Sequence, residues 1–184
     1  MKQRYGAWQH WVQRQVVMAL LALALVSPAW AQTPRTVLVM GDSLSAAYNL
    51  APEQGWVALL GRKLGAERPG WTVANASISG ETTAGGASRI AAELARHKPA
   101  VVVIELGAND GLRGLPLEQT RANLERMVAA SREAGARVLL VGMRLPPNYG
   151  PEYTNGFERN YVELSDTHDI ALLPFLLEPI AAER

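Results

Sequence analysis

Short apolar runs alternate with longer amphipathic segments along most of the chain. The apolar runs span 37–40, 71–74, 101–106, 137–143 and 170–175. Runs of this length, bounded by glycine, proline or polar residues, are typical of strands that are buried on both faces. The segments with apolar residues at helical spacing are 53–65, 82–97, 117–134 and 151–167. Strands separated by helices predict an α/β fold, in which a parallel sheet has helices on both faces.

The first apolar run ends in a turn signal that is followed by a serine. Gly41-Asp42 comes directly after the run, and residues 44–48 can begin a helical turn. Ser43 is therefore expected at the carboxyl end of a strand and at the start of a helix, where backbone N–H groups favour negative charge. A nucleophilic serine and the oxyanion it generates would be placed there. The alternative is that Asp42 or Ser43 only caps a helix.

Two further loops follow strands that we expect to be neighbours of the first. Residues 75–80 end in Gly80, and residues 107–110 include Asn109. Because the carboxyl ends of parallel strands meet at one edge of a sheet, these loops should converge on Ser43. The N–H groups of Ser43 and Gly80 and the amide of Asn109 would then form an oxyanion hole. Alternatively, Gly80 only leads into a helix and Asn109 only forms an Asx-turn.

Composition and charge exclude several classes of site. The chain has no cysteine, so disulfides and thiolate metal sites are impossible. The formal net charge of the 184 residues is +1, but the first 31 contain Lys2, Arg4 and Arg14 and no acidic residue. The remaining residues carry 15 Lys and Arg against 17 Asp and Glu, a net charge of −2. This balance does not suggest a nucleic-acid partner.

The first 31 residues have the pattern of a signal peptide. A basic start is followed by the apolar run 16–26 and by Ala29-Trp30-Ala31, an A-x-A cleavage site. We expect the mature chain to begin at Gln32 and the protein to be periplasmic or secreted. The apolar run is short for a membrane span, although an uncleaved anchor is the alternative. No cysteine follows the run, so we expect neither a lipid anchor nor a stable membrane anchor.

Four sequence blocks resemble those of one enzyme family. They are GDSLSAAY, NASISGETT, ELGANDGLRG and MRLPPNYG, in this order from about Thr36 onward. They are similar to the SGNH (GDSL) hydrolases, in particular the bacterial periplasmic group of acyl-CoA thioesterases, lysophospholipases and arylesterases. The resemblance implies a three-layer α/β sandwich with a five-stranded, parallel, flavodoxin-like sheet.

The resemblance also implies a reaction and its residues. Ser43 would be the nucleophile, and the N–H groups of Ser43 and Gly80 and the Asn109 amide would bind the oxyanion. The reaction would be a two-step acyl transfer to water from a small-molecule ester or thioester, without a metal or another cofactor. We also expect the enzyme to be a monomer.

One part of the family pattern is missing. The catalytic aspartate and histidine of these hydrolases lie in a D-x-x-H block after the fifth strand, and residues 32–184 contain no such block. His10 is in the signal segment, and His97 is expected at the surface, at the end of a helix just before Pro99. His168 ends the helix that leads into the fifth strand, so it should lie at the opposite edge of the sheet from Ser43. Asp166 and His168 are expected to be a capping or solvated pair. The sequence therefore predicts a hydrolase domain over 32–184 that is incomplete at its C-terminus and inactive by itself.

Residues beside the predicted site are candidates for substrate binding. Loop 111–116 has apolar tips and could fold over an acyl chain, and residues 145–149 leave the fourth strand at the same edge. The candidate residues are Asp42, Leu44, Gly111, Leu112, Arg113 and Pro146. Arg113 could meet a phosphate or coenzyme A, although ordinary connections are the alternative for both loops.

Two non-enzymatic functions remain as alternatives. One is a flavodoxin-like module with Gly41 to Ser43 as a phosphate cradle, and the other is a pseudo-enzyme that binds acyl or carbohydrate groups.

Overall fold

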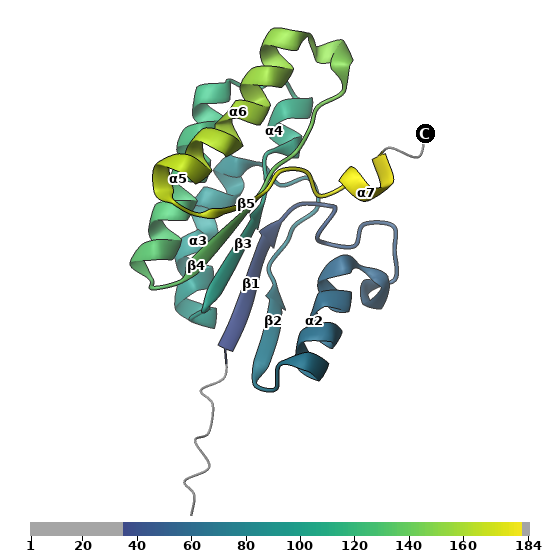
Figure 1. Cartoon of the computed structure of the whole chain (residues 1–184), viewed down its shortest axis with the longest axis vertical. Helices are drawn as coiled ribbons and strands as arrows, with labels where there is room; N and C mark the ends of the chain where they lie inside the picture. The colour runs from purple at the N-terminus through teal and green to yellow at the C-terminus, as the bar shows by residue number, and fades with distance from the viewer. Residues whose placement is uncertain (1–34, 182–184) are drawn as a thin grey trace, which may run out of the picture. The chain divides into compact units, whose positions relative to one another are not determined.

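A computed structural model describes residues 35–181 of the chain, and their order of elements is the predicted alternation of strands and helices (Figure 1). The predicted signal peptide over 1–31, the mature terminus at Gln32 and His10 lie outside the described residues. The strands are β1 (Arg35–Gly41), β2 (Trp71–Asn75), β3 (Val101–Glu105), β4 (Arg137–Val141) and β5 (Ala171–Leu173). The helices are η1 (Pro52–Gln54), α2 (Trp56–Glu67), α3 (Thr83–His97), α4 (Ala108–Leu112), α5 (Leu117–Glu133), η2 (Pro147–Tyr149), α6 (Pro151–His168) and α7 (Glu178–Ala181).

The five strands form one parallel sheet in the order β2-β1-β3-β4-β5. This is the flavodoxin-like order, so the predicted α/β fold is confirmed. The chain runs outward from β1 to β2 and then returns past β1 to β3, so the order reverses between β1 and β3. Ligands of such sheets bind outside the carboxyl ends of these two strands. Gly41 lies next to Glu105 there, at the end of the β1–β3 pairing.

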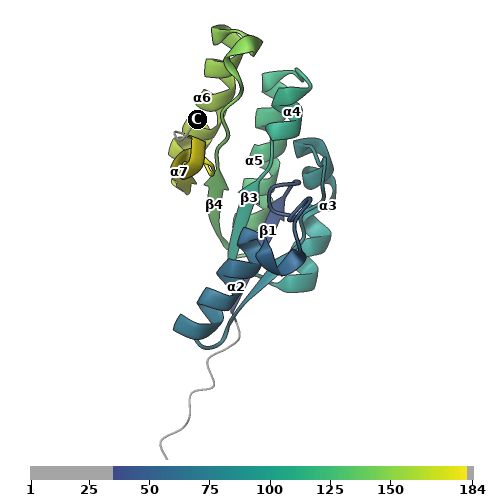
Figure 2. The same cartoon turned by 90° about the vertical axis from the view of Figure 1, so that its right-hand side faces the viewer.

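The sheet buries both of its faces because consecutive residues of the central strands are apolar and point alternately to the two faces. One face contributes Leu38, Met40, Val102, Ile104 and Leu140 to a core shared with α3, α5 and α6. The opposite face contributes Val37, Val39, Val103 and Val141 to a smaller core, against which Val57, Trp56 and Leu64 of α2 pack. Figures 1 and 2 show α2 across the sheet from the other three long helices.

Two details differ from the expectation. Residues 43–49 form a series of turns instead of a helix, with Ala47 and Asn49 at φ values of 57° and 60°. Left-handed residues cannot continue a right-handed helix, so residues 43–49 do not form the helix that was expected to begin at Ser43. The second difference is α4, which begins right after β3 where a loop was expected.

The region of predicted helix 53–65 also differs in detail. It consists of η1 and α2, and Leu59, one of the apolar residues of this segment, is 49% exposed. Within residues 35–181, no helix combines the length and the apolar character that crossing a membrane requires.

Gly107, between β3 and α4, lets us test how tightly this junction is packed. Its φ is +122°, and a side chain there would overlap the hydroxyl of Tyr161, which is buried and donates to the Leu106 carbonyl at 3.0 Å. Gly135 has φ +80° but open space around it, so it is a matched control. We expect Gly135→Ala to lower the free energy of unfolding by about 1–2 kcal/mol. Gly107→Ala should lower it by roughly 1–3 kcal/mol more.

Denaturant unfolding of both variants measures the difference. Equal losses at the two positions would mean that the Tyr161 contact adds nothing to the backbone strain.

Candidate active site

Ser43 lies on a tight turn directly after β1, at the carboxyl edge of the sheet. The turn begins with Asp42, whose Oδ1 accepts the N–H of Leu44 at 3.0 Å. The Ala46 N–H donates to the Asp42 carbonyl at 2.9 Å, and the Tyr48 N–H donates to the Ser43 carbonyl at 3.1 Å. Asp42 is buried, whereas Ser43 is only half-buried. The turn therefore fixes the backbone of Ser43 and leaves its side chain accessible.

The side chain of Asn109 links this turn to the loop that follows β2. Its Nδ2 donates to Oδ2 of Asp42 at 3.1 Å and to the carbonyl of Glu81 at 2.9 Å. Asn109 lies in the first turn of α4, which follows β3 directly. The structure thus brings together the three loops that the sequence expects at one edge of the sheet.

Gly80 lies in a turn whose ends are Ile78 and Glu81. The N–H of Glu81 donates to the Ile78 carbonyl at 3.1 Å, and Gly80 has φ +79°, which is the third-residue geometry of a type II turn and favours glycine. Helix α3 begins later, with Thr82 as its N-cap. Among residues 35–181, neither the N–H of Gly80 nor that of Ser43 has a hydrogen-bond acceptor. Two backbone donors are therefore free near the Asn109 amide.

Ser43 and Asn109 line a mostly apolar cavity of ≈ 300 Å³ at this edge. Its other lining residues are Asp42, Leu44, Ala108, Leu112, Met143, Arg144, Leu145, Pro146, Phe175 and Leu177. Four of the six predicted substrate-binding residues are thus on its wall, namely Asp42, Leu44, Leu112 and Pro146.

Gly111 and Arg113 are not part of that wall. Gly111 is buried, and a Cβ there would be 2.6 Å from a methyl group of Leu145 and 3.0 Å from the ring of Phe157. Arg113 instead donates to the carbonyl of Gly80 at 3.1 Å. Both residues therefore lie beside the site, in structural contacts.

The walls of the cavity that the sequence analysis missed come from the ends of β4 and β5. Met143 and Arg144 follow β4, and Phe175 and Leu177 follow β5. The carboxyl ends of β4 and β5 meet at the same edge of the sheet as that of β3. The position of these four residues after a strand was therefore the available signal.

Glu105 is a functional neighbour that the sequence analysis did not single out. It is the last residue of β3 and is only 1% exposed. Its Oε2 accepts the hydroxyl of Ser45 at 2.6 Å and the N–H of Asp42 at 3.3 Å, whereas Oε1 has no partner among the described residues. Burial, and next the nearby charge of Asp42, raise the pKa of Glu105 to about 8. Burial also raises the pKa of Asp42, although its bonds from Leu44 and Asn109 oppose this shift.

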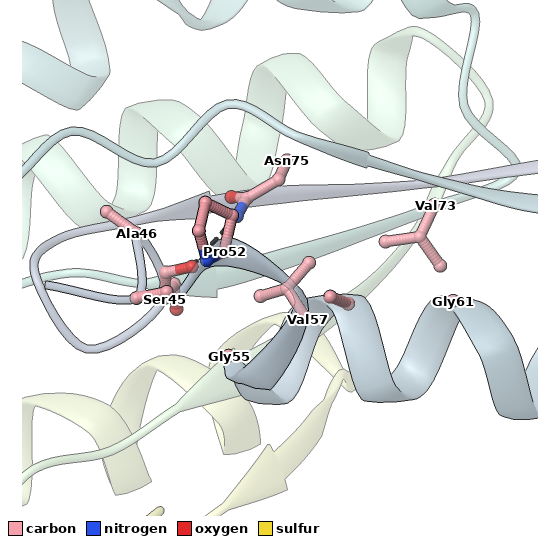
Figure 3. A pocket seen from close by; sticks show the side chains of 10 residues that line it. Ser45, Ala46, Pro52, Gly55, Val57, Gly61, Val73 and Asn75 are labelled. Carbon is pink, nitrogen blue, oxygen red and sulfur yellow. Dashed lines mark hydrogen bonds between the residues drawn. The ribbon is translucent and has the colours of Figure 1, made fainter. Parts of the chain in front are cut away.

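A second cavity lies beside the turn that follows Ser43, as Figure 3 shows. It is bounded by small or branched side chains of the turn, of α2 and of β2, and its volume is ≈ 290 Å³. At its mouth, the Asn75 side chain donates to the carbonyl of Ser45 at 2.8 Å, which supports the turn from the side of β2 (Figure 3). Ser43 is not among its lining residues.

The two histidines within residues 35–181 lie far along the sheet from this edge. His97 ends α3 and pairs with Glu93 at 3.3 Å, and His168 ends α6. Both helices lead into the amino ends of strands, so both histidines are at the edge opposite Ser43, which was expected for His168. The expected pairing of His168 with Asp166 is wrong, because its Nε2 is 3.2 Å from a carboxylate oxygen of Glu125 on the neighbouring helix α5.

One protein family matches nearly all of the described residues. It is the GDSL-like lipase/acylhydrolase family, and the match covers residues 39–184. The chain belongs to this family. The predicted resemblance is therefore confirmed, and the G-D-S-L residues occur in this chain as Gly41 to Leu44, in the turn of Ser43.

Relatives with named activities are similar to this acylhydrolase over most of its length. Esterase TesA of Pseudomonas aeruginosa is 51% identical over 158 residues, which are 86% of this chain and 79% of the relative. Thioesterase 1/protease 1/lysophospholipase L1 of Escherichia coli is 42% identical over 145 residues, or 79% of this chain and 68% of the relative. The predicted class of carboxylic ester hydrolase is thereby supported.

A solved structure has the same fold. The psychrotrophic esterase EstA from Pseudoalteromonas sp., in a crystal structure inhibited by monoethylphosphonate, superposes with a TM-score of 0.77. It is 44% identical in sequence, and the match covers 80% of this chain and 81% of that one.

The raised pKa of Glu105 predicts how stability depends on pH. Glutamic acid has an ordinary value of 4.5, so between pH 4.5 and about 8 the unfolded state ionises at this residue while the folded state stays protonated. The contribution of Glu105 is therefore complete below pH 4.5 and is lost as the pH rises to about 8, by at most about 1.4 kcal/mol per pH unit. Glu105→Gln, which keeps a neutral group of the same shape, should remove this loss.

Denaturant unfolding at several pH values from 5 to 8.5 checks the prediction, with the exposed Glu118→Gln as the matched control. Parallel stability curves for the wild type and Glu105→Gln would show that Glu105 does not titrate in this range.

Proposed function

We propose that this acylhydrolase cleaves acyl esters or thioesters with Ser43 as its nucleophile. The observation that supports the proposal is that the Asn109 amide bonds both to Asp42, which precedes Ser43, and to Glu81, which follows Gly80, so that three candidate donors come from loops at one edge of the sheet. These donors are the Ser43 N–H, the Gly80 N–H and the Asn109 amide, and the two backbone groups have no acceptor within residues 35–181. Preorganised donors of this kind stabilise the negative charge that develops on an acyl oxygen during attack.

The reaction has two steps in this proposal. In the first, the Ser43 Oγ attacks the acyl carbonyl, its proton passes to a general base, and the carbonyl oxygen becomes the oxyanion between the three donors. The C–O or C–S bond then breaks, the base returns the proton to the leaving alcohol or thiol, and an acyl-serine remains. In the second step, water loses a proton to the base and attacks the acyl-serine, which releases the acid and restores Ser43.

Asn109 has a double task in this scheme. Its amide nitrogen has two hydrogens, and Asp42 and Glu81 already accept from it at 3.1 Å and 2.9 Å. One of these hydrogens must therefore be shared with the oxyanion when it forms. Because Asp42 also orients the nucleophile turn through Leu44, one carboxylate aligns both the nucleophile and the Asn109 donor.

The general base is proposed to come from outside residues 35–181. A serine hydroxyl needs a base within hydrogen-bond reach, and histidine is the usual one. His97 and His168 instead pair with Glu93 and Glu125 at the opposite edge of the sheet.

The cavity beside Ser43 supports an acyl group as the part of the substrate that is recognised. Leu44, Leu112, Leu145, Phe175 and Leu177 make its wall largely apolar. An apolar wall next to the nucleophile suits an acyl chain. The leaving group would lie on the solvent side, where this wall does not distinguish an alcohol from a thiol. The relatives are named esterase and thioesterase/lysophospholipase, which supports the same class of small-molecule substrate.

The non-enzymatic alternatives are not favoured. A phosphate-binding module would direct several backbone N–H groups of the first loop at the ligand. Here the Asp42 and Leu44 N–H groups are already bound to Glu105 and Asp42, and the adjoining cavity is apolar.

Substitution of Asn109 tests the proposed oxyanion hole. In the full-length protein, Asn109→Ala should lower kcat on p-nitrophenyl butyrate by roughly 10²–10³, with a smaller effect on KM, because the donor acts on the transition state. Ser43→Ala should abolish turnover. The exposed Asn155→Ala on α6 is the matched control and should retain wild-type kcat.

Thermal unfolding of Asn109→Ala shows whether the variant is folded. A folded Asn109→Ala variant with unchanged kcat would remove Asn109 from the site, and a fully active Ser43→Ala variant would refute the nucleophile.

We further propose that the protein is exported and cleaved after Ala31. The support is the basic start, the apolar run 16–26 and the A-x-A sequence at 29–31. N-terminal sequencing of periplasmic protein should then begin at Gln32. Replacing Ala29 and Ala31 by leucine should block cleavage, because the site requires small residues. Recovery of the wild-type protein with its original N-terminus in the membrane fraction would contradict the proposal.

A further inference from the structure

Arg113 has an unusual environment for an exposed arginine. Its Nη2 donates to the carbonyl of Gly80 at 3.1 Å, and the same nitrogen is 3.9 Å from the point that a Cβ on Gly80 would occupy. Among residues 35–181, no carboxylate lies within ion-pair distance of it. Its charge is therefore directed at a peptide group next to the predicted oxyanion hole.

Arg113 and Asn109 reach the β2–α3 loop from one side of the same helical segment. They are four residues apart, and the Arg113 N–H donates to the Asn109 carbonyl at 3.2 Å at the end of α4, so their side chains lie on one face. Asn109 donates to the carbonyl of Glu81, and Arg113 donates to the carbonyl immediately before it, that of Gly80. Two consecutive carbonyls of the β2–α3 loop are thus held from α4.

The backbone that carries Arg113 is itself anchored. The hydroxyl of Tyr149 donates to the carbonyl of Leu112 at 2.9 Å, and the hydroxyl of Tyr153 donates to the carbonyl of Leu115 at 2.7 Å. The guanidinium therefore extends from a segment that is fixed on both sides of it, which makes its bond to Gly80 a link between two loops.

Glycine is the residue that most needs such a link. Gly80 has no side chain to restrict its rotation, and its φ of +79° is one of several that glycine adopts readily. The direction of its N–H depends on the bonds to the neighbouring peptide groups. The turn bond from Glu81 to Ile78 is local, so Arg113 and Asn109 supply the contacts from another element.

We propose that Arg113 is a positioning residue of the oxyanion hole. Through the Gly80 carbonyl it holds the Gly80–Glu81 peptide, and so fixes the orientation of the adjoining Ser79–Gly80 peptide, whose N–H would face the acyl oxygen. This inference rests on the proposed role of Gly80. Arg113 would then stabilise the transition state indirectly, by aligning a donor. The sequence had suggested a different role, in which Arg113 could meet a phosphate or coenzyme A of the substrate. A residue that aligns a donor changes kcat, whereas a residue that binds the substrate's phosphate changes KM for phosphate-bearing substrates.

The test compares Arg113→Gln, Arg113→Lys and the wild type in the full-length protein. On the neutral substrate p-nitrophenyl butyrate, Arg113→Gln should lower kcat roughly tenfold with KM unchanged, the effect of one charge-assisted hydrogen bond. Arg113→Lys should recover part of the loss, since an ammonium can still donate to the Gly80 carbonyl. The exposed Arg126→Gln on α5 is the matched control and should behave as the wild type.

A second measurement separates alignment from general damage to the fold. Inactivation by a p-nitrophenyl alkylphosphonate places a negatively charged oxygen in the oxyanion hole, so its rate should fall in parallel with kcat in Arg113→Gln. The midpoint of thermal unfolding should stay within the range of the Arg126→Gln control.

The outcomes distinguish this inference from the function on which it rests. If Asn109→Ala loses activity while Arg113→Gln keeps its kcat, the role of Arg113 is refuted and the oxyanion hole stands. If the only effect of Arg113→Gln is a higher KM for the phosphate-bearing substrates palmitoyl-CoA and lysophosphatidylcholine, Arg113 binds phosphate and the inference is wrong. If neither Asn109→Ala nor Arg113→Gln affects kcat, the proposed oxyanion hole fails together with this inference, whereas a fully active Ser43→Ala variant would refute the proposed function itself. If Arg113→Gln does not fold, Arg113→Lys is tested instead. A folded Arg113→Lys variant that the phosphonate inactivates at the wild-type rate would overturn the inference.

Discussion

The carboxylate of Asp42 joins the two parts of the candidate site. One of its oxygens accepts the Leu44 N–H and shapes the turn of Ser43, and the other accepts the Asn109 amide from α4. A buried carboxylate is unfavourable unless hydrogen bonds compensate for the lost water, and here the compensating donors are the groups that must be aligned. The same low-polarity surroundings raise the pKa of Asp42 and of its neighbour Glu105. Stability and alignment of the site thus depend on a single side chain.

The fold was predictable because its signals are local and repeated. Each strand is an apolar run, and the parallel direction of the strands follows from the helices between them. That direction alone placed Ser43, Gly80 and Asn109 at one edge, and the structure brings their loops together there through bonds from Asn109. His168 was placed at the opposite edge for the same reason.

What the sequence did not reveal depends on contacts between distant residues. Helix α4 has a glycine and an aspartate among its five residues, so its own preference for helix is weak, and it is held by the close packing of Gly111 on Leu145 and Phe157. Ala47 takes a left-handed φ that alanine seldom adopts, so the turns after Ser43 looked like a helix. His168 meets Glu125 only because α5 and α6 are adjacent in space. Glu105 was hidden because it ends an otherwise apolar strand.

The packing beneath the nucleophile turn also limits how this segment can vary. A Cβ on Gly41 would be 2.6 Å from both the Cβ and the hydroxyl of Ser45, and 2.7 Å from a carboxylate oxygen of Glu105. These contacts make positions 41, 45 and 105 one steric unit, although 60 residues separate the last two in the sequence. A larger residue at any one of them requires a smaller one elsewhere in the unit. Engineering of this turn would therefore have to vary the three positions jointly, since single-site libraries would sample almost only combinations that cannot pack.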